Sequence, residues 1–201
     1  MDHPLVMFDM GGVVVDVESD RMVHQLAQLT GTTYEAAHAA VYDKTLLYPF
    51  EIGKISGRDY YEGLKKRLKL PWPYERFVTA WNDVFRENVD VTRILQRLSN
   101  RHRLIALTNT NELHLAYLRS NIPALSVIQD WVASCEVGAC KPDPAIYFEA
   151  LKRSGMLPRQ AVYVDDRPEM VEGGRSLGIT AVRFENSRQL EQDLQSIGLN
   201  L

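Results

Sequence analysis

The chain has 201 residues, of which 45% are hydrophobic and 24% charged, and its net charge at pH 7 is −3. This composition is typical of a globular protein in water, and it lacks the basic balance that nucleic-acid binding requires. No apolar run approaches the roughly 18 residues that span a bilayer, and no basic leader with a cleavage site precedes the first apolar run. We therefore expect a cytoplasmic protein without nucleic-acid or membrane partners. The length suits one core domain with a sizeable insertion, or two small domains.

The first predicted element is a buried strand. The apolar run from Leu5 to Phe8 is too short for a helix, and it resembles a strand covered on both faces of a parallel sheet. Asp9 ends this run, and Gly11 and Gly12 follow it, where glycine lets another group approach the backbone closely. Ligands of open α/β sheets bind outside the carboxyl ends of the strands. Asp9 is therefore a candidate site residue, and the alternative is an acid that only caps a glycine turn.

Residues 19–85 are predicted to be helical throughout, because apolar residues repeat at helical spacing and no strand pattern interrupts them. Glycine and proline residues, Pro49 among them, separate the pieces. We expect a small helical bundle inserted after the first strand. The apolar positions are Met22, Val23, Leu26 and Leu29; the alanine-rich segment 34–42; Tyr60, Tyr61, Leu64 and Leu68; and Phe77, Trp81, Val84 and Phe85.

From Asp90 onward, helices and strands alternate. Alternation of this kind predicts parallel strands joined by right-handed crossovers, and hence a doubly wound, mainly parallel, Rossmann-like α/β sheet. The predicted strands are 104–107, 131–134, 161–164 and 179–184. The predicted helices are 91–98, 111–120, 145–153, 170–177 and 189–197.

Polar residues follow several of these strands. Because the carboxyl ends of parallel strands meet at one edge of the sheet, we expect these residues to converge. Carboxylates are hard oxygen ligands that suit Mg²⁺ together with a substrate phosphate. A lysine, a hydroxyl and a backbone N–H group can hold the phosphate itself. The candidate residues are Asp9, Thr108, Asn109, Lys141, Asp165 and Asp166.

Cysteine and histidine residues give no sign of a zinc site, which would need more ligands at a recognisable spacing. Cys135 and Cys140 are the only cysteines. A loop disulfide or a redox pair is the alternative, but without an export signal we expect two reduced thiols. We expect His102 and His114 to lie at the surface.

Four motifs, taken in order, resemble the haloacid dehalogenase-like (HAD) hydrolase superfamily. They are D-x-G-G-V at 9–13, L-T-N-T-N at 107–111, C-K-P-D-P-x-I-Y at 140–147 and V-D-D-R-P-E at 164–169. Each motif alone is weak, but four in order are specific. The resemblance covers the whole chain: residues 1–16 and 87–201 correspond to the superfamily's α/β core, and residues 17–86 to its helical C1 cap. Within the superfamily, the chain looks most similar to bacterial α-D-glucose-1-phosphate phosphatases and to the phosphatase domain of soluble epoxide hydrolase.

The resemblance implies a Mg²⁺-dependent phosphatase. Asp9 would be the nucleophile that becomes an aspartyl phosphate, a role that carboxylates do serve. Asp9 would also bind Mg²⁺ together with the Gly11 carbonyl and Asp166. Asp165 would contact the ligands of the metal, or the metal itself through a water molecule.

The same resemblance assigns the phosphate contacts. Thr108 and the Asn109 amide would hold the phosphate, and Lys141 would neutralise Asp9 and the transferring oxygens. The implied partner is a small phosphorylated metabolite, such as glucose 1-phosphate, and the implied assembly is a monomer or a weak dimer.

Two positions depart from the superfamily's pattern. Gly11 stands where most of its phosphatases carry a second aspartate, the general acid and base, and such groups contribute about 10²–10⁴-fold to the rate. Asp16 and Glu51 are candidate replacement acids, although each can also be an ordinary polar residue. Met170 stands where related proteins usually have Asn or Asp, and such supporting partners can change metal affinity or activity about 10–100-fold.

Alternative functions follow from the same residues. Gly11 and Met170 favour a catalytically weak phosphosugar-binding or regulatory module. A phosphotransferase or mutase of the superfamily would need the acid that Gly11 lacks. A metal-free dehalogenase would not need the Asp165–Asp166 pair. We expect the aromatic residues of the helical region to form its core or to stack on a sugar, and the segment 50–56 to turn toward the site.

Overall fold

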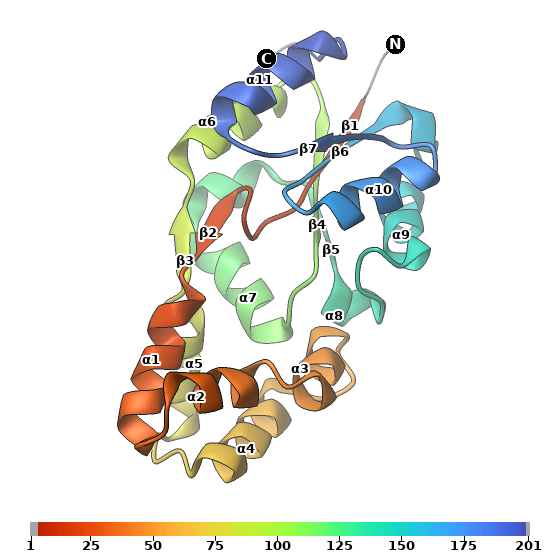
Figure 1. The fold of residues 1–201 in the computed structure, drawn as a ribbon. Helices are drawn as coiled ribbons and strands as arrows, with labels where there is room; N and C mark the ends of the chain where they lie inside the picture. Colours follow the sequence, from red (N-terminus) through yellow and green to blue (C-terminus); the bar gives the residue numbers. More distant parts are fainter. Residues whose placement is uncertain (1–3, 200–201) are drawn as a thin grey trace.

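A parallel sheet forms the centre of the computed structural model, which describes residues 4–199 (Figure 1). Five strands lie in the order β5-β4-β1-β6-β7, and every neighbouring pair is parallel. This confirms the predicted α/β fold with a doubly wound, Rossmann-like sheet. The strands are β1 (Leu5–Phe8), β4 (Arg103–Thr108), β5 (Asp130–Ala133), β6 (Ala161–Asp165) and β7 (Thr180–Arg183).

Helices cover both faces of the sheet because its strands are apolar on both sides. In β1, Val6 and Phe8 face one layer, while Leu5 and Met7 face the other, and all four are buried. The first layer holds α6 (Val89–Leu98), α7 (Glu112–Asn121) and α11 (Ser187–Ser196). The second layer holds α9 (Pro144–Ser154) and α10 (Pro168–Ser176).

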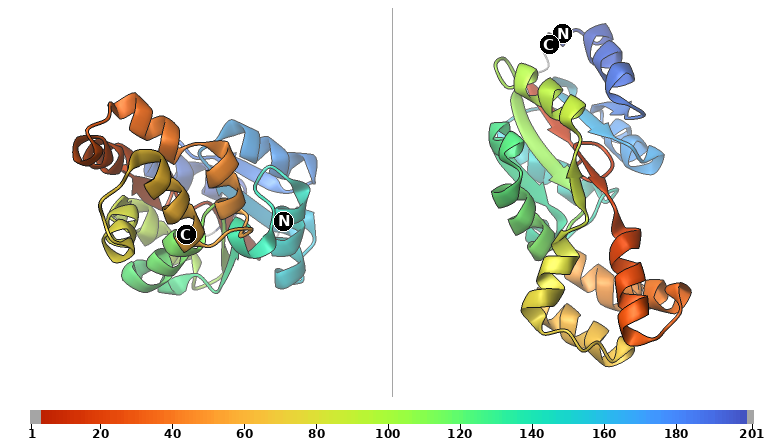
Figure 2. Two further views of the ribbon diagram at one scale, coloured as in Figure 1. Left: turned by 90° about the horizontal axis from the view of Figure 1, so that it is seen from below. Right: turned by 90° about the vertical axis from the view of Figure 1, so that its left-hand side faces the viewer.

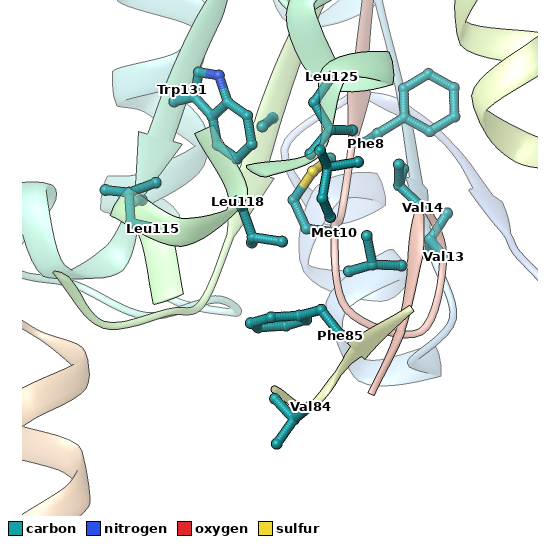
Figure 3. Packing of buried hydrophobic residues seen from close by; sticks show 14 of the residues in the cluster. Phe8, Met10, Val13, Val14, Val84, Phe85, Leu115, Leu118, Leu125 and Trp131 are labelled. Carbon is teal, nitrogen blue, oxygen red and sulfur yellow. The ribbon is translucent and has the colours of Figure 1, made fainter. Parts of the chain in front are cut away.

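The loop after β1 is anchored by its own apolar side chains. Met10, Val13 and Val14 are fully buried and pack in one cluster with Leu118 of α7 and Phe85 (Figure 3). The backbone N–H groups of Val13, Val14 and Val15 all donate to the Met10 carbonyl, at 3.3, 2.9 and 2.9 Å. The loop that follows Asp9 is therefore fixed by packing and by hydrogen bonds before any ligand binds.

Five helices are inserted between two short strands. The strands β2 (Val15–Val17) and β3 (Phe85–Glu87) form an antiparallel ribbon, with Val17 paired to Phe85. The helices lie together at one end of the molecule, and α11 lies at the other (Figures 1 and 2). They are α1 (Ser19–Thr30), α2 (Tyr34–Val41), α3 (Lys44–Glu51), α4 (Gly57–Leu68) and α5 (Tyr74–Asn82), and we call them the insertion.

Aromatic rings fill the core of the insertion. Phe50 stacks on Tyr60 with 4.7 Å between ring centroids, and Tyr60 contacts Trp81 at 5.0 Å. The buried hydroxyl of Tyr60 donates to the Val41 carbonyl, and that of Tyr61 donates to the Trp72 carbonyl. These rings therefore form the core of the bundle.

The structure corrects several predictions for this region. Val84 and Phe85, assigned to a helical face, lie beyond the end of α5, and Phe85 begins β3. Strands of three residues are too short to show a two-residue period. Pro49 lies inside α3 rather than between helices, because near the end of a short helix it removes only one backbone hydrogen bond. Leu29 is 41% exposed.

Short elements joining the sheet and helices were not predicted. They are η1 (Pro123–Val127), α8 (Ser134–Val137) and η2 (Pro158–Gln160). Cys135 and Cys140 are free thiols, as expected. Across residues 4–199, no helix combines the length and the apolar character that a membrane crossing requires.

His114 joins the insertion to the core instead of lying at the surface. Its Nε2 is 2.9 Å from the Trp81 carbonyl, its Nδ1 is 3.2 Å from the side-chain amide of Asn111, and its ring stacks on Trp81. A neutral imidazole satisfies both contacts, donating from Nε2 and accepting at Nδ1. Burial lowers the pKa of His114 to about 4.

This histidine makes stability depend on pH. Between pH 6.5 and 4 the unfolded chain binds a proton at His114 that the folded chain does not, so the contribution of His114 to the free energy of unfolding should fall as pH decreases, by up to about 3 kcal/mol. Urea unfolding at pH 7, 5 and 4 measures this. His114→Gln should remove this contribution from the pH dependence of the wild-type protein, whereas His24→Gln, at an exposed position of α1, should leave the pH dependence unchanged. An equal slope in His114→Gln would contradict the assignment.

Candidate active site

Three neighbouring strands bring polar side chains to one edge of the sheet. Asp9 directly follows β1, Thr108 ends β4 and Asp165 ends β6. Because β1 lies between β4 and β6, the three side chains converge at the centre of the sheet, as the sequence predicted. All three are buried, Asp165 completely.

Lys141 reaches this point from the segment between α8 and α9. Its ammonium lies 3.0 Å from Asp9 Oδ1 and 2.7 Å from Asp165 Oδ2, and only 3% of the residue is exposed. Tyr163 also donates to Asp165 Oδ2, and the Arg167 backbone N–H donates to Asp165 Oδ1 at 2.9 Å. Both oxygens of Asp165 are thus occupied by protein donors, so Asp165 is suited to support the site rather than to hold a metal directly.

Asn109 positions the Lys141 backbone. Its side-chain amide donates to the Lys141 carbonyl at 2.9 Å, and its side-chain oxygen accepts from the Lys141 N–H at 2.7 Å. Sequence reasoning assigned Asn109 to phosphate through its amide. The side chain is engaged with Lys141, so its backbone N–H is the group that remains for an anion.

Asp166 completes an acidic cluster. Carboxylate oxygens of Asp9, Asp165 and Asp166 lie within 4.8 Å of one another. Within residues 4–199, Asp166 Oδ1 is a buried oxygen with no hydrogen-bond partner. Gly12 permits this approach, because its φ is +80° and an added Cβ would lie 2.8 Å from Asp166 Oδ2. A buried oxygen without a donor is suited to bind a cation, and Mg²⁺ prefers such ligands.

The electrostatics agree with a cation at this place. Burial raises the pKa of Asp9 to about 6, even though the Lys141 ammonium acts in the opposite direction. Burial, together with the charge of Asp165, also raises the pKa of Asp166. A single ammonium thus leaves the cluster with excess negative charge.

A cavity of about 180 Å³ opens beside Asp9 and Lys141. Since water occupies about 30 Å³ in the liquid, this space admits a phosphate group. Met170 lines it and offers a thioether where a polar partner was expected. The lining residues are Asp9, Gly11, Val17, Thr108, Asn109, Lys141, Arg167 and Met170.

A second cavity, of about 150 Å³, lies between the core and the insertion. It adjoins the first, since Val17 and Asn109 line both. Glu51 lines the second cavity, whereas Asp16 is exposed on β2 and lines neither. Of the two candidate replacement acids, Glu51 is therefore the one that lines a cavity beside the site.

Sequence reasoning missed Arg167, Tyr163 and Ser134. Arg167 follows Asp166 directly, and Tyr163 precedes Asp165 by two residues in β6 and so shares its face of the strand. The sequence positions of both residues could therefore have placed them near the site. Ser134 carried no local signal, because its contacts to Thr110 and to the Glu51 carbonyl connect distant segments.

A family model described as haloacid dehalogenase-like hydrolase matches residues 3–178. The chain belongs to this family. The superfamily and the hydrolase class suggested by the four motifs are thus confirmed. The closer similarity to glucose-1-phosphate phosphatases and to the phosphatase domain of soluble epoxide hydrolase stays a prediction.

Individual relatives of this HAD hydrolase are more distant. It is 24% identical over 200 residues to D-ribitol-5-phosphate phosphatase of Bacteroides thetaiotaomicron, covering 96% of this chain and 97% of the relative. It is 26% identical over 183 residues to phosphorylated carbohydrates phosphatase of Thermotoga maritima, covering 88% and 82%.

A solved structure has the same fold. HAD family enzyme bt-2542 from Bacteroides thetaiotaomicron, in complex with magnesium and inorganic phosphate, superposes with a TM-score of 0.80 at 17% identity. The match covers 90% of this chain and 93% of that one.

Removing the Lys141 charge should destabilise this HAD hydrolase. In Lys141→Met, two buried carboxylates lose their counter-charge, and breaking such a pair costs about 3–5 kcal/mol. Urea unfolding at pH 7 in metal-free buffer measures the loss. Lys152→Met, at a lysine whose side chain is 80% exposed, should change stability by less than about 0.5 kcal/mol. Similar values for both variants would contradict the ion-pair assignment.

Proposed function

We propose that this HAD hydrolase is a Mg²⁺-dependent phosphatase of small phosphomonoesters, with sugar phosphates such as glucose 1-phosphate as its substrate class. One observation carries the proposal: Asp9 and Lys141, ion-paired and buried, line a cavity of phosphate size, and the carboxylates of Asp165 and Asp166, the latter with an unpartnered oxygen, lie close to Asp9. The two curated relatives act, by their names, on ribitol 5-phosphate and on phosphorylated carbohydrates, which supports this substrate class.

The catalytic steps assigned to the chain's own residues begin with Asp9. Its carboxylate attacks the phosphorus and forms an aspartyl phosphate. Oδ1 accepts the Met10 N–H at 2.7 Å and the Lys141 ammonium, which orients the carboxylate toward the cavity. The Thr108 hydroxyl and the Asn109 N–H hold the phosphate oxygens, and Lys141 neutralises charge as the phosphoryl group transfers.

Asp9, Asp166 and the Gly11 carbonyl are the proposed Mg²⁺ ligands, with Asp165 supporting them. When bound, Mg²⁺ supplies a second positive charge to the phosphate oxygens and offsets the acidic cluster. The unpartnered Asp166 Oδ1 and the raised pKa values of Asp9 and Asp166 support this assignment. Bound magnesium in the bt-2542 structure is consistent with it.

Residues 17–86 are the proposed cap domain, and residues 1–16 and 87–201 the proposed core domain. A roof over the site suits a small phosphorylated metabolite and excludes a phosphoprotein, and its closure would exclude water between steps. We propose a monomer or a weak dimer in the cytoplasm.

Replacing the nucleophile tests the proposal. With Mg²⁺ present, Asp9→Asn should release phosphate from a sugar-phosphate panel at less than about one thousandth of the wild-type rate, because the attacking group is lost. EDTA should abolish wild-type turnover and added Mg²⁺ restore it. Asp16→Asn, at an exposed aspartate outside both cavities, should keep full activity. Absence of turnover together with measurable phosphosugar binding would instead support a binding module.

Leaving-group chemistry ranks the substrates. Gly11 offers no acid, and the anomeric oxygen of glucose 1-phosphate needs less protonation than the C6 oxygen of glucose 6-phosphate. We expect kcat/KM to be about tenfold higher for glucose 1-phosphate. Steady-state phosphate release on the two isomers measures the ratio, and equal values would contradict the ranking.

A further inference from the structure

The site described so far has a nucleophile but no proton donor for the leaving group. In an in-line displacement, the leaving oxygen departs on the side opposite the nucleophile. Asp9 lies on the floor formed by the sheet, so the departing oxygen faces the insertion. A donor must therefore come from that side.

Glu51 is the acid placed there. Of the residues that line the two adjoining cavities, Asp9 and Glu51 are the carboxylic acids: Asp9 lines the first cavity and Glu51 the second. His114 also lines the second cavity, but its two ring nitrogens are engaged with Trp81 and Asn111.

The position of Glu51 is fixed by docking of the insertion on the core. Ser134 Oγ donates to the Glu51 carbonyl at 2.7 Å. Gly53 follows at φ +68°, and a Cβ there would lie 2.1 Å from the Cys135 carbonyl, so only glycine permits this approach. The Gly57 N–H donates to Glu112 Oε1 at 2.6 Å. Three contacts within seven residues thus hold the end of α3 and the loop after it against the core.

The surroundings of Glu51 suit a proton donor. Burial raises the pKa of its carboxyl, while the charge of Arg167, which lines the catalytic cavity, acts in the opposite direction. The charge of Glu51 also raises the pKa of Cys140, the residue before Lys141. The Glu51 carboxyl thus lies within electrostatic range of Arg167, which lines the Asp9 cavity, and of Cys140.

We propose that Glu51 protonates the leaving oxygen of the substrate from the insertion, in place of the side chain that Gly11 lacks. The proposal rests on the phosphatase function proposed above. In the first step, an Asp9 oxygen bonds to phosphorus, the bond to the leaving oxygen breaks, and the Glu51 proton passes to that oxygen to release the alcohol. In the second, water attacks phosphorus, the Asp9–phosphorus bond breaks, and phosphate departs with both protons of the water, while Glu51 regains its proton from solvent.

Leaving-group dependence tests this role in Glu51→Gln, measured with saturating Mg²⁺. For glucose 6-phosphate, whose alkoxide must be protonated, kcat should fall about 100-fold or more. For p-nitrophenyl phosphate, whose phenolate leaves without a proton, kcat should stay within about threefold, which also shows that the variant is folded. Glu62→Gln, at an exposed glutamate of α4, should match wild type on both substrates.

Three results would overturn the assignment of Glu51. They are an equal loss on both substrates, no loss on either, or a change confined to KM, which would make Glu51 a contact to the sugar. The phosphatase function would still stand in each case if the wild-type protein turns over both substrates with Mg²⁺. No Mg²⁺-dependent turnover of p-nitrophenyl phosphate by the wild-type protein would instead refute the phosphatase function itself.

Discussion

The Lys141 ammonium between two buried carboxylates is the interaction on which the rest of the site depends. Removing each of these ions from water costs several kcal/mol, which is offset only when partners and hydrogen bonds are well placed. The sheet supplies that placement, because β1 and β6 are neighbours and end in Asp9 and Asp165. Asn109, Tyr163 and the Arg167 N–H then satisfy the remaining groups.

The same arrangement leaves the site with more negative than positive charge. Three aspartates share one lysine at this edge, so the resting site is short of positive charge. In the proposed phosphatase, an additional cation would offset the negative charge of a dianionic phosphate at this site. Charge balance would then connect metal binding to substrate binding, independently of any particular substrate.

Sequence reasoning located the residues whose position follows from one strand. Asp9, Thr108 and Asp165 each end a buried apolar run, so the edge of the sheet could be predicted. It did not find what depends on packing between distant segments: the side-chain role of Asn109 and the contacts of His114 with Trp81 and Asn111. The β2–β3 ribbon was missed because a strand of three residues carries no periodic signal. Pro49 was wrongly predicted to separate two helices, because proline more often marks the end of a helix than its interior.

The β2–β3 ribbon has one more consequence. Val17 and Phe85 are paired across it, and paired residues of antiparallel strands have Cα atoms about 5 Å apart. The whole insertion therefore leaves and re-enters the core at a single narrow seam. A tight turn could close that seam without moving any strand of the sheet, and so could an unrelated bundle. The fold is modular in this sense: the same sheet edge with its site residues is compatible with different inserted segments. Specificity can therefore change by exchange of the whole insertion, while the residues at the sheet edge are retained.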